Sequence, residues 1–490
     1  MTPALILSVI GIYFVLLFVI GYYSSKGSNN ESFFIGNRNS SWYVVAFGMV
    51  GGSISGVTFI SVPGMVATSS FSYMQMVLGF MVGYAVIALV LMPLYFRLNL
   101  TSIYGYLEQR FGTMSYRTGA SFFLLSRTIG SAFRLYLVAN VLQLTVFDAL
   151  GVPFVVTVVG TILFIWSYTY KGGVKTIVWT DTFQTFFMLT AVFLTVGLIG
   201  KEMGWGVEEL IAQVRVSDHS RIFFFDDPDS KDYFWKQFLG GAFMAVAMTG
   251  LDQDMMQKNL SCRSLRDAQI NVFTFSTVLV FVNLAFLALG ALLYIYAAQK
   301  GIELPAKSDD LYPMLATGGH LPIIVGIIFI LGLIAAALAS VDSALAALTT
   351  SVCVDLLDIN KRPENTQQRL RKQMHVLVSV VMVAVILIFR AMNDDSVVRQ
   401  VFTVASYTYG PLLGLYAFGM MTKLSVRDNW VPVICILSPI ICYFININSV
   451  ALFGGYKFGF ELLILNGAIT FFGLWLLSLG KGIKTVQRDV

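Results

Sequence analysis

Long apolar runs recur along the whole chain and are separated by short polar stretches. A run of 18 or more apolar residues is long enough to cross the ~30 Å hydrocarbon core of a bilayer as a helix. The strands of an outer-membrane barrel would instead alternate over segments of ~10 residues. The pattern therefore predicts an all-α membrane protein with about thirteen transmembrane helices, whose cores are 3–24, 42–69, 72–98, 116–148, 152–170, 176–200, 233–257, 268–299, 320–356, 370–391, 396–422, 428–447 and 458–480.

Two of these segments, 42–69 and 233–257, hold more small and polar residues than a plain membrane helix. The first contains MVGGSISGVTFISVPG, where glycines, hydroxyl side chains and Pro63 weaken or interrupt a helix. The second reads GGAFMAVAMTGLDQDMMQ. In lipid, a broken helix persists only where protein or a bound polar ligand satisfies its backbone. The alternative for the first segment is a kinked helix whose hydroxyls bond to their own carbonyls.

The two interrupted segments lie five segments apart, which is the signature of a transporter built from two inverted repeats. We therefore expect one domain over 1–490. It would hold an extra N-terminal helix at 3–24, a five-helix repeat at 42–200, a second repeat at 233–422 and two extra helices at 428–480. A soluble catalytic domain fits nowhere, and neither a nucleophile–base pair nor a set of metal ligands points to an enzyme.

Composition agrees with a membrane protein, because 57% of residues are hydrophobic and only 12% are charged. A soluble protein carries roughly twice that charged fraction. The net charge of +5 does not indicate nucleic-acid binding, since most basic residues lie in loops beside membrane segments.

The basic residues also predict an orientation. With the N-terminus outside, 20 Lys and Arg residues, among them Lys258, fall on the inner side and 10 on the outer side. The positive-inside rule then predicts a cytoplasmic C-terminus and an odd number of spans. We expect a multi-pass protein of the inner or plasma membrane that is a monomer in the bilayer.

Asp181 is the first candidate for chemistry, because it enters the apolar segment 176–200. A carboxylate within the membrane is costly and is by default a functional hypothesis. The alternative is an interfacial residue that caps a helix. Arg127 and Arg134 lie seven residues apart on one helix face and suit a membrane carboxylate or an anionic substrate. Snorkelling or a structural ion pair is the alternative for both arginines.

The segment AAALASVDSALAA at 335–347 forms a stripe of small residues. Helical spacing puts Ala336, Ala339, Ser340 and Ser343 on one face, with Asp342 beside them. Close helix packing explains the small residues, but packing does not require a carboxylate. Hydroxyls and a carboxylate, together with carbonyls freed by a broken helix, are hard oxygen ligands that suit Na⁺.

Together these motifs resemble the solute:sodium symporter family, whose members share the LeuT-type fold of two inverted five-helix repeats. The most specific match is GGVKTIVWTDTFQ at 172–184. Trp42–Gly64, LTSIYGYLEQRFG at 100–112, QDMMQKNLSCRSL at 253–265, ASVDSAL at 339–345 and GPLLGLYAFGM at 410–420 match in order. The resemblance implies a transporter that couples inward Na⁺ flow to uptake of a small polar organic solute by alternating access.

The resemblance also implies one or two sodium sites as the only cofactors. The main site would use Gly51, Ile54, Ala336, Ala339 and Ser340. The family usually has a hydroxyl where Ala339 stands, so one ligand is missing here.

A second site, found in some members, would use Asp181, Asp342 and Ser343. Certain members have serine where Asp342 stands. Because both carboxylates are present, our hypothesis is that the protein binds two Na⁺. Proton coupling through either carboxylate remains an alternative.

For the solute, the resemblance points to Ser53, Ser55 and Thr58 on the broken helix and to Tyr73 and Met74 on the next. The TFISVP run is more similar to sialic acid and monocarboxylate symporters than to the glucose branch. A half-helix N-terminus with hydroxyls also favours a carboxylate.

Four further residues are solute candidates. Arg134 lies near the arginine of sialic acid carriers but is displaced from it, whereas Gln75, Asp252 and Gln253 are suited to sugar hydroxyls. The alternatives to an organic-anion symporter are a sugar or polyol symporter and, in a different class, a sensor or channel of the same fold.

Overall fold

The computed structural model describes residues 3–24, 38–392 and 397–479, although the side chains of 167–175 and of a few single positions lie outside this description. The described chain is helical apart from turns and loops, as the sequence predicts. Its first half holds α1 (Pro3–Ser24), α3 (Trp42–Ser53), α4 (Gly56–Ser69), α5 (Tyr73–Val86), α6 (Met92–Arg97), α7 (Gly105–Arg110), α8 (Thr113–Leu142), α9 (Phe154–Met203) and α10 (Val207–Val216).

The second half continues with eleven α-helices among the described residues. They are α11 (Phe234–Ala245), α12 (Gln253–Leu260), α13 (Leu265–Gln299), α14 (Leu311–Thr317), α15 (Ile323–Ser351), α16 (Glu364–Met392), α17 (Val397–Thr408), α18 (Gly410–Met421), α19 (Val431–Ile447), α20 (Ser449–Leu452) and α21 (Leu462–Ser478). Short π-helical turns extend α5, α8, α11 and α15 at Ile87–Leu91, Gln143–Phe147, Val246–Gly250 (η5) and Val352–Leu356.

Among the described residues, eight helices are long and apolar enough to cross a membrane, or nine if α3 and α4 form one bent span. Three predicted segments, 152–170, 396–422 and 458–480, coincide with shorter apolar helices. A fourth, 233–257, falls on the interrupted run of α11, η5 and α12. The count of thirteen therefore stays a prediction.

The predicted segments 152–170 and 176–200 both fall within α9, which runs through the residues between them. Part of the GGVKTIVWTDTFQ motif, at 172–175, belongs to the positions whose side chains are not described. α9 packs against α15, α3 and α1, and Asp181 on it is fully buried.

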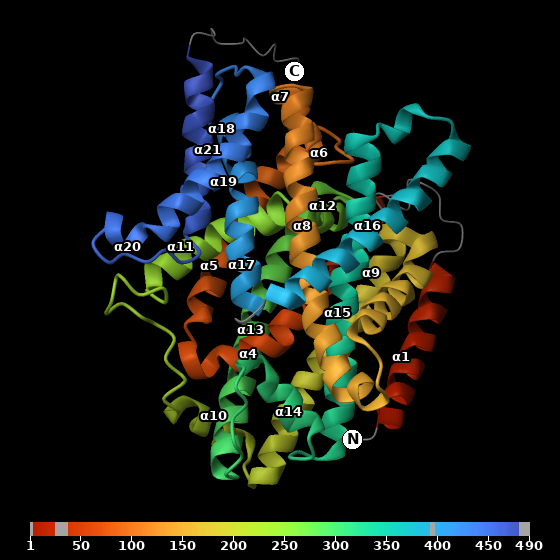
Figure 1. Cartoon of the computed structure of the whole chain (residues 1–490), viewed down its shortest axis with the longest axis vertical. Helices are drawn as coiled ribbons and strands as arrows, with labels where there is room; N and C mark the ends of the chain where they lie inside the picture. The colour runs from red at the N-terminus through yellow and green to blue at the C-terminus, as the bar shows by residue number, and fades with distance from the viewer. Residues whose placement is uncertain (1–2, 25–37, 393–396, 480–490) are drawn as a thin grey trace.

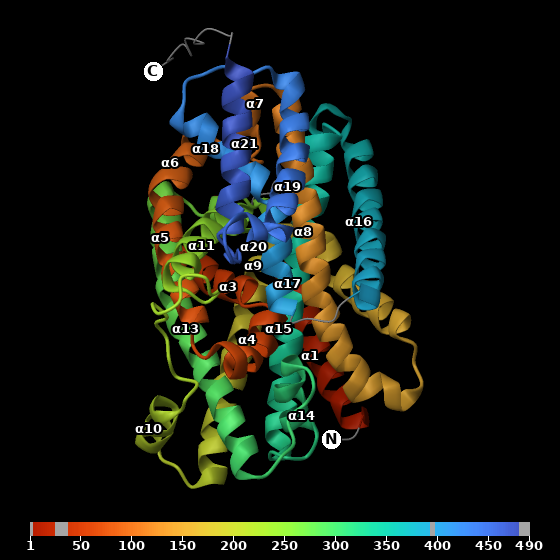
Figure 2. The ribbon, with the colours of Figure 1, turned by 60° about the vertical axis from the view of Figure 1, so that its left-hand side comes forward.

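The broken pair α3–α4 lies in the middle of the molecule (Figure 2), where it packs against α9, α13 and α15. The long helices α8, α13 and α15 run along the long axis around it, and α1 lies at the outer edge against α9 (Figure 1). The helices α18, α19 and α21 pack together at one end. The interrupted helix is thus surrounded by protein, as its unsatisfied backbone requires.

The first interruption is confirmed at Ile54 and Ser55, where the axes of α3 and α4 differ by 56°. Ile54 has φ −83° and ψ 83°, and Ser55 is extended. Glycines let neighbouring helices approach the break closely. A Cβ at Gly51 would collide with the Thr185 hydroxyl, and one at Gly56 would lie 2.7 Å from Val138 Cγ2.

The second interruption is confirmed at Leu251 and Asp252, between η5 and α12. Leu251 leaves the helical region with φ −109° and ψ 16°. Asp252 caps α12, since its side chain accepts a hydrogen bond of 3.2 Å from the Met255 amide. A carboxylate at this position is favoured by the helix dipole as well as by the hydrogen bond.

Candidate functional site

A cavity of about 90 Å³ lies against the first helix break. The broken pair, α5, α8, α13 and α17 form its walls together with α11 and η5. Two arginines line it, and among the described residues around it there is no Asp or Glu. Its polar lining consists of Ser53, Ser55, Thr58, Tyr73, Tyr84, Arg127, Arg134, Thr249 and Asn283.

The structure brings five of the nine predicted solute residues to this cavity. They are Ser53, Ser55, Thr58, Tyr73 and Arg134. Met74 is buried but does not line the cavity, although it follows Tyr73 directly. Neighbouring side chains on a helix point about 100° apart, so only one of the two can face the break.

Gln75 and Gln253 also lie away from the cavity, because their amides hold loops. Gln75 Nε2 donates to the Asp232 carbonyl at 2.9 Å, and its Oε1 accepts from the Phe224 amide at 3.0 Å. Gln253 Oε1 accepts from the Ile103 amide at 2.9 Å, and its Nε2 donates to the Thr101 carbonyl at 3.0 Å. Both amides are fully used in these contacts.

A second, larger cavity of about 500 Å³ adjoins the first. Tyr73 and Phe402 line both cavities, and their ring centroids lie 6.4 Å apart. Phe460, which lines only the larger cavity, packs on Phe402 at 5.1 Å. Two aromatic side chains therefore form the boundary between the small cavity and the larger space.

The residues predicted for the main sodium site lie on α3, on its break and on α15, and α15 packs against both α3 and α4. Among the described residues, no hydrogen bond ends on the carbonyls of Gly51 or Ile54, because the chain leaves the helix there. Ser340 is fully buried on α15, and its hydroxyl donates to the Ala336 carbonyl at 3.1 Å. Ala339 is also buried and supplies no side-chain ligand. Free carbonyls and a buried hydroxyl are groups that Na⁺ can use.

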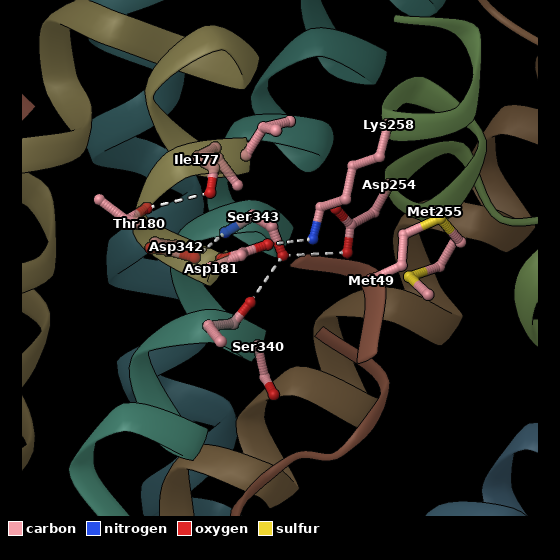
Figure 3. A network of polar contacts seen from close by, with 12 residues as sticks. Met49, Ile177, Thr180, Asp181, Asp254, Met255, Lys258, Ser340, Asp342 and Ser343 are labelled. Atoms are coloured by element: carbon pink, nitrogen blue, oxygen red, sulfur yellow. Dashed lines mark hydrogen bonds and ion pairs between the residues drawn. The ribbon is translucent and has the colours of Figure 1, made fainter. Parts of the chain in front are cut away.

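Beside this region lies a buried charged cluster (Figure 3). Lys258 on α12 donates to Asp181 Oδ2 on α9 at 2.6 Å. The Lys258 side chain is 3% exposed and that of Asp181 is fully buried. The ammonium also lies close to α3, only 2.9 Å from where a Cβ on Gly52 would stand. This ion pair therefore links α9 to α12 directly beside the first break.

Asp254 is the second carboxylate of the cluster. It forms a buried ion pair with Arg127 of α8 and accepts a hydrogen bond of 3.2 Å from the Ser343 hydroxyl of α15. The Ser343 amide in turn donates to Asp342 Oδ1 at 2.6 Å. Ser343 thus connects the predicted residue Asp342 to α12 and, through Asp254, to α8.

Asp252 completes the cluster from the second break. It accepts a hydrogen bond of 2.5 Å from the Tyr409 hydroxyl, at the junction of α17 and α18, and lies 3.8 Å from Arg127 Nη1. It does not line the cavity, whereas Arg127 does. The first residues of α12 are therefore tied to three other parts of the bundle.

Three members of the cluster, Asp254, Lys258 and Tyr409, were not predicted from the sequence. Lys258 was counted among basic residues of the inner loops. It is instead buried, because α12 continues to Leu260 after the break. The available signal was the spacing of Asp254 and Lys258, four residues apart and hence on one helix face. An acid–base pair directly after a broken membrane helix indicates burial rather than a loop.

Comparison with known proteins agrees with this architecture. Residues 33–427 match the model of the Sodium:solute symporter family. The sodium/sialic acid symporter SiaT of Proteus mirabilis is 23% identical over 84% of this chain and 83% of its own length. The human sodium/iodide cotransporter is 25% identical over 80% of this chain and 61% of its own length. A sodium-coupled monocarboxylate transporter 2 of Danio rerio is 25% identical over 84% and 67%.

Two solved structures share the fold. A substrate-bound, outward-open Na⁺-coupled sialic acid symporter superposes with a TM-score of 0.81 at 20% identity, covering 96% of this chain and 97% of that one. A nucleobase-cation-symport-1 transporter in a closed conformation gives a TM-score of 0.55 at 13% identity, covering 91% and 94%. The fold is therefore the LeuT-type helical fold, and the chain is a Na⁺-coupled membrane transporter, not an enzyme, that belongs to the sodium:solute symporter family.

Proposed function

We propose that this transporter imports a small organic anion of the carboxylate class. The observation that carries the proposal is the lining of the cavity, which holds Arg127 and Arg134 but, within the described chain, no acidic residue. Because Arg127 already pairs with Asp254, the role of primary anion ligand falls to Arg134. Sialic acid, iodide and monocarboxylates, the solutes named for the similar transporters, are all anions.

The size of the cavity favours a short carboxylate over a nine-carbon sugar acid. On the scale by which one water needs about 10–15 Å³ of cavity space, a cavity of about 90 Å³ has room for roughly six to nine water-sized groups, which is the size of a short carboxylate. Ser55 and Thr58, at the start of α4, would donate to the carboxylate, and its short apolar tail would face Val57 and Met248. The positive end of the α4 dipole points to the same place.

We further propose that two Na⁺ accompany each solute. One would bind at Gly51, Ile54, Ala336, Ala339 and Ser340. This ion would join the broken helix to α15, so that its release inside frees both elements and the solute with them. Each coupled ion contributes ~2.3 kcal/mol per 100 mV of membrane potential.

The second Na⁺ would use Asp181, Asp342 and Ser343. The coupling number tests this ion. A measured ratio of one Na⁺ per solute that is unchanged in Asp342→Ala would exclude this ion.

The topology follows the same proposal. The N-terminus lies outside, the C-terminus lies in the cytoplasm, and the protein works as a monomer. The inverted repeats cover 42–200 and 233–422, so that the two helix breaks occupy equivalent places in the two halves. Alternating access then consists of one set of helices rocking against the other around the cavity.

The proposal is tested by thermal shift of the purified protein with a panel of solutes in NaCl and in KCl. We expect stabilisation by lactate- or pyruvate-sized carboxylates that requires Na⁺. Stabilisation by sialic acid alone would contradict the argument from cavity size. Stabilisation by neutral sugars would contradict the proposal that the solute is an anion.

Uptake into proteoliposomes then separates transport from a sensor or channel. A symporter shows saturable, concentrative uptake that is driven by an imposed Na⁺ gradient. Arg134→Gln should weaken uptake of the carboxylate at least tenfold, because a charge-assisted contact is lost. Arg117→Gln, at an exposed ion pair on the same helix, is the matched control.

A further inference from the structure

Lys258 places an ammonium group directly on a predicted sodium ligand. Its Nζ lies 2.6 Å from Asp181 Oδ2, both side chains are buried, and the pair is part of the cluster in Figure 3. Asp254 and Asp342 also interact electrostatically with the same ammonium. A compact cation that is held among three carboxylates occupies the environment that a sodium ion would need.

The other oxygen of the same carboxylate remains available. Asp181 Oδ1 is buried and has no hydrogen-bond partner among the described residues. One turn further along the same face of α9, Gln184 is 1% exposed, and neither of its polar atoms has a partner in the described chain. Buried polar atoms without partners are uncommon and call for a bound ion or water. Two such groups on adjacent turns indicate where an ion can enter.

We propose that Asp181 exchanges two cations during transport, the tethered ammonium of Lys258 and a free Na⁺. The inference rests on the proposed second ion and explains how that ion is released. With Na⁺ on Oδ1 and the ammonium on Oδ2, two positive charges would lie a few ångströms apart in a medium of low dielectric, where their repulsion is strong. Binding of Na⁺ at Asp181 therefore weakens the Lys258 contact, and return of Lys258 expels Na⁺.

The exchange has a structural consequence, because Lys258 belongs to the helix that follows the second break and its ammonium reaches the helix that precedes the first. It lies on α12, six residues after Asp252, and its ammonium abuts Gly52 of α3. When Na⁺ replaces the ammonium on Asp181, α12 loses its link to α9 and retains those through Asp252 and Asp254. The cation bound to Asp181 therefore decides whether α12, the helix after the second break, is linked to α9.

The test measures Na⁺ binding to purified protein, with NaCl replacing choline chloride at constant ionic strength. Readouts are the Na⁺ midpoint of thermal stabilisation and the number of ions bound in equilibrium binding of radioactive sodium. If the ammonium holds Asp181 in about nine molecules of ten, Lys258→Gln should lower the Na⁺ midpoint about tenfold. Lys236→Gln is the matched control, because this buried lysine donates to the carbonyls of Asp229 and Lys457 instead.

If Lys258→Gln does not fold, Lys258→Arg tests the same competition between the lysine and Na⁺. A guanidinium grips a carboxylate more firmly than an ammonium does, so the Na⁺ midpoint should rise. A midpoint that is unchanged in Lys258→Arg, or that is equal to or above the wild-type value in folded Lys258→Gln, overturns the exchange.

Asp181→Asn separates this inference from the proposal beneath it. If the variant loses one bound Na⁺ while the Lys258 variants bind as the wild type does, only the exchange is wrong. If the variant binds the same number of ions at the same midpoint, Asp181 holds no Na⁺ and both proposals fail. The solute proposal, which depends on Arg134, is untouched by either result.

Discussion

The two helix breaks have opposite chemistry, although each interrupts a helix with buried residues on both sides. The first, at Ile54 and Ser55, is flanked by glycines and hydroxyls and faces the cavity. The second, at Leu251 and Asp252, is followed at once by Asp254 and Lys258, whose charges pair with α8 and α9. One break is neutral and open to a ligand, whereas the other is charged and closed by protein.

The two breaks also differ in what stabilises them. Under the proposed function, the neutral break would leave its carbonyls for an ion and its hydroxyls for a solute. A charged break in a buried place is held by its partners, because separating a buried ion pair leaves an uncompensated charge. The second break is therefore held by ion pairs to α8 and α9, whereas the first, among the described residues, is not.

The largest expected effect comes from breaking the ion pairs at the second break. Arg127→Met removes the ion pair of Asp254 and the cation that lies 3.8 Å from Asp252. Breaking a buried pair in this way costs about 3–5 kcal/mol, so we expect a strongly lowered Tm in detergent. Arg117→Met removes an exposed pair of 3.7 Å with Asp358 and should change stability by less than about 1 kcal/mol. Equal Tm values for the two variants would show that the second break is not held by charge.

The next effect concerns sodium at the neutral break. Ser340→Ala removes a buried hydroxyl from the predicted main site, and the Na⁺ midpoint of uptake should rise about tenfold, equivalent to about 1.4 kcal/mol. Ala339→Ser supplies the hydroxyl that the family usually has there and should move the midpoint the other way. Uptake at varied NaCl measures both. If the Na⁺ midpoint moved in the same direction in both variants, the ion would not bind at the predicted main site.

Both breaks and the all-helical fold could be predicted from the sequence, because glycine, proline and hydroxyl side chains that gather inside an apolar run weaken the helix there. The cluster around Lys258 could not. Lys258 on α12 and its partner Asp181 on α9 are 77 positions apart in the chain, and only packing brings them together. Similarly, Gln75 and Gln253 look like sugar ligands in the sequence, yet their amides bind loop backbone. Polar residue type predicts that a group needs a partner, not which partner it finds.

A smaller effect separates cavity residues from loop-holding residues. Thr58→Val keeps the shape of the side chain and removes one hydroxyl from the cavity lining. The solute Kd should rise about three- to tenfold, the value of one hydrogen bond, with little change in Tm. Gln75→Leu should do the reverse, because the Phe224 amide and the Asp232 carbonyl lose their partner while the cavity is unchanged. Isothermal titration gives the solute Kd of each variant, and thermal unfolding gives its Tm. A raised solute Kd in Gln75→Leu would indicate that Gln75 contacts the solute.

The smallest expected effect joins the two breaks. A Cβ on Gly52 would lie 2.9 Å from Lys258 Nζ, which is closer than such atoms normally approach. The end of a lysine is flexible, so Gly52→Ala should push the ammonium away from Asp181 without unfolding α3. If the ammonium and Na⁺ compete, the Na⁺ midpoint falls about threefold, in the same direction as in Lys258→Gln but less far. Gly197→Ala, whose Cβ would meet nothing within 4 Å, is the control on α9. A Na⁺ midpoint that rises in Gly52→Ala alone would mean that Lys258 supports sodium binding, and the neutral break would then depend on the charged one for affinity rather than for release.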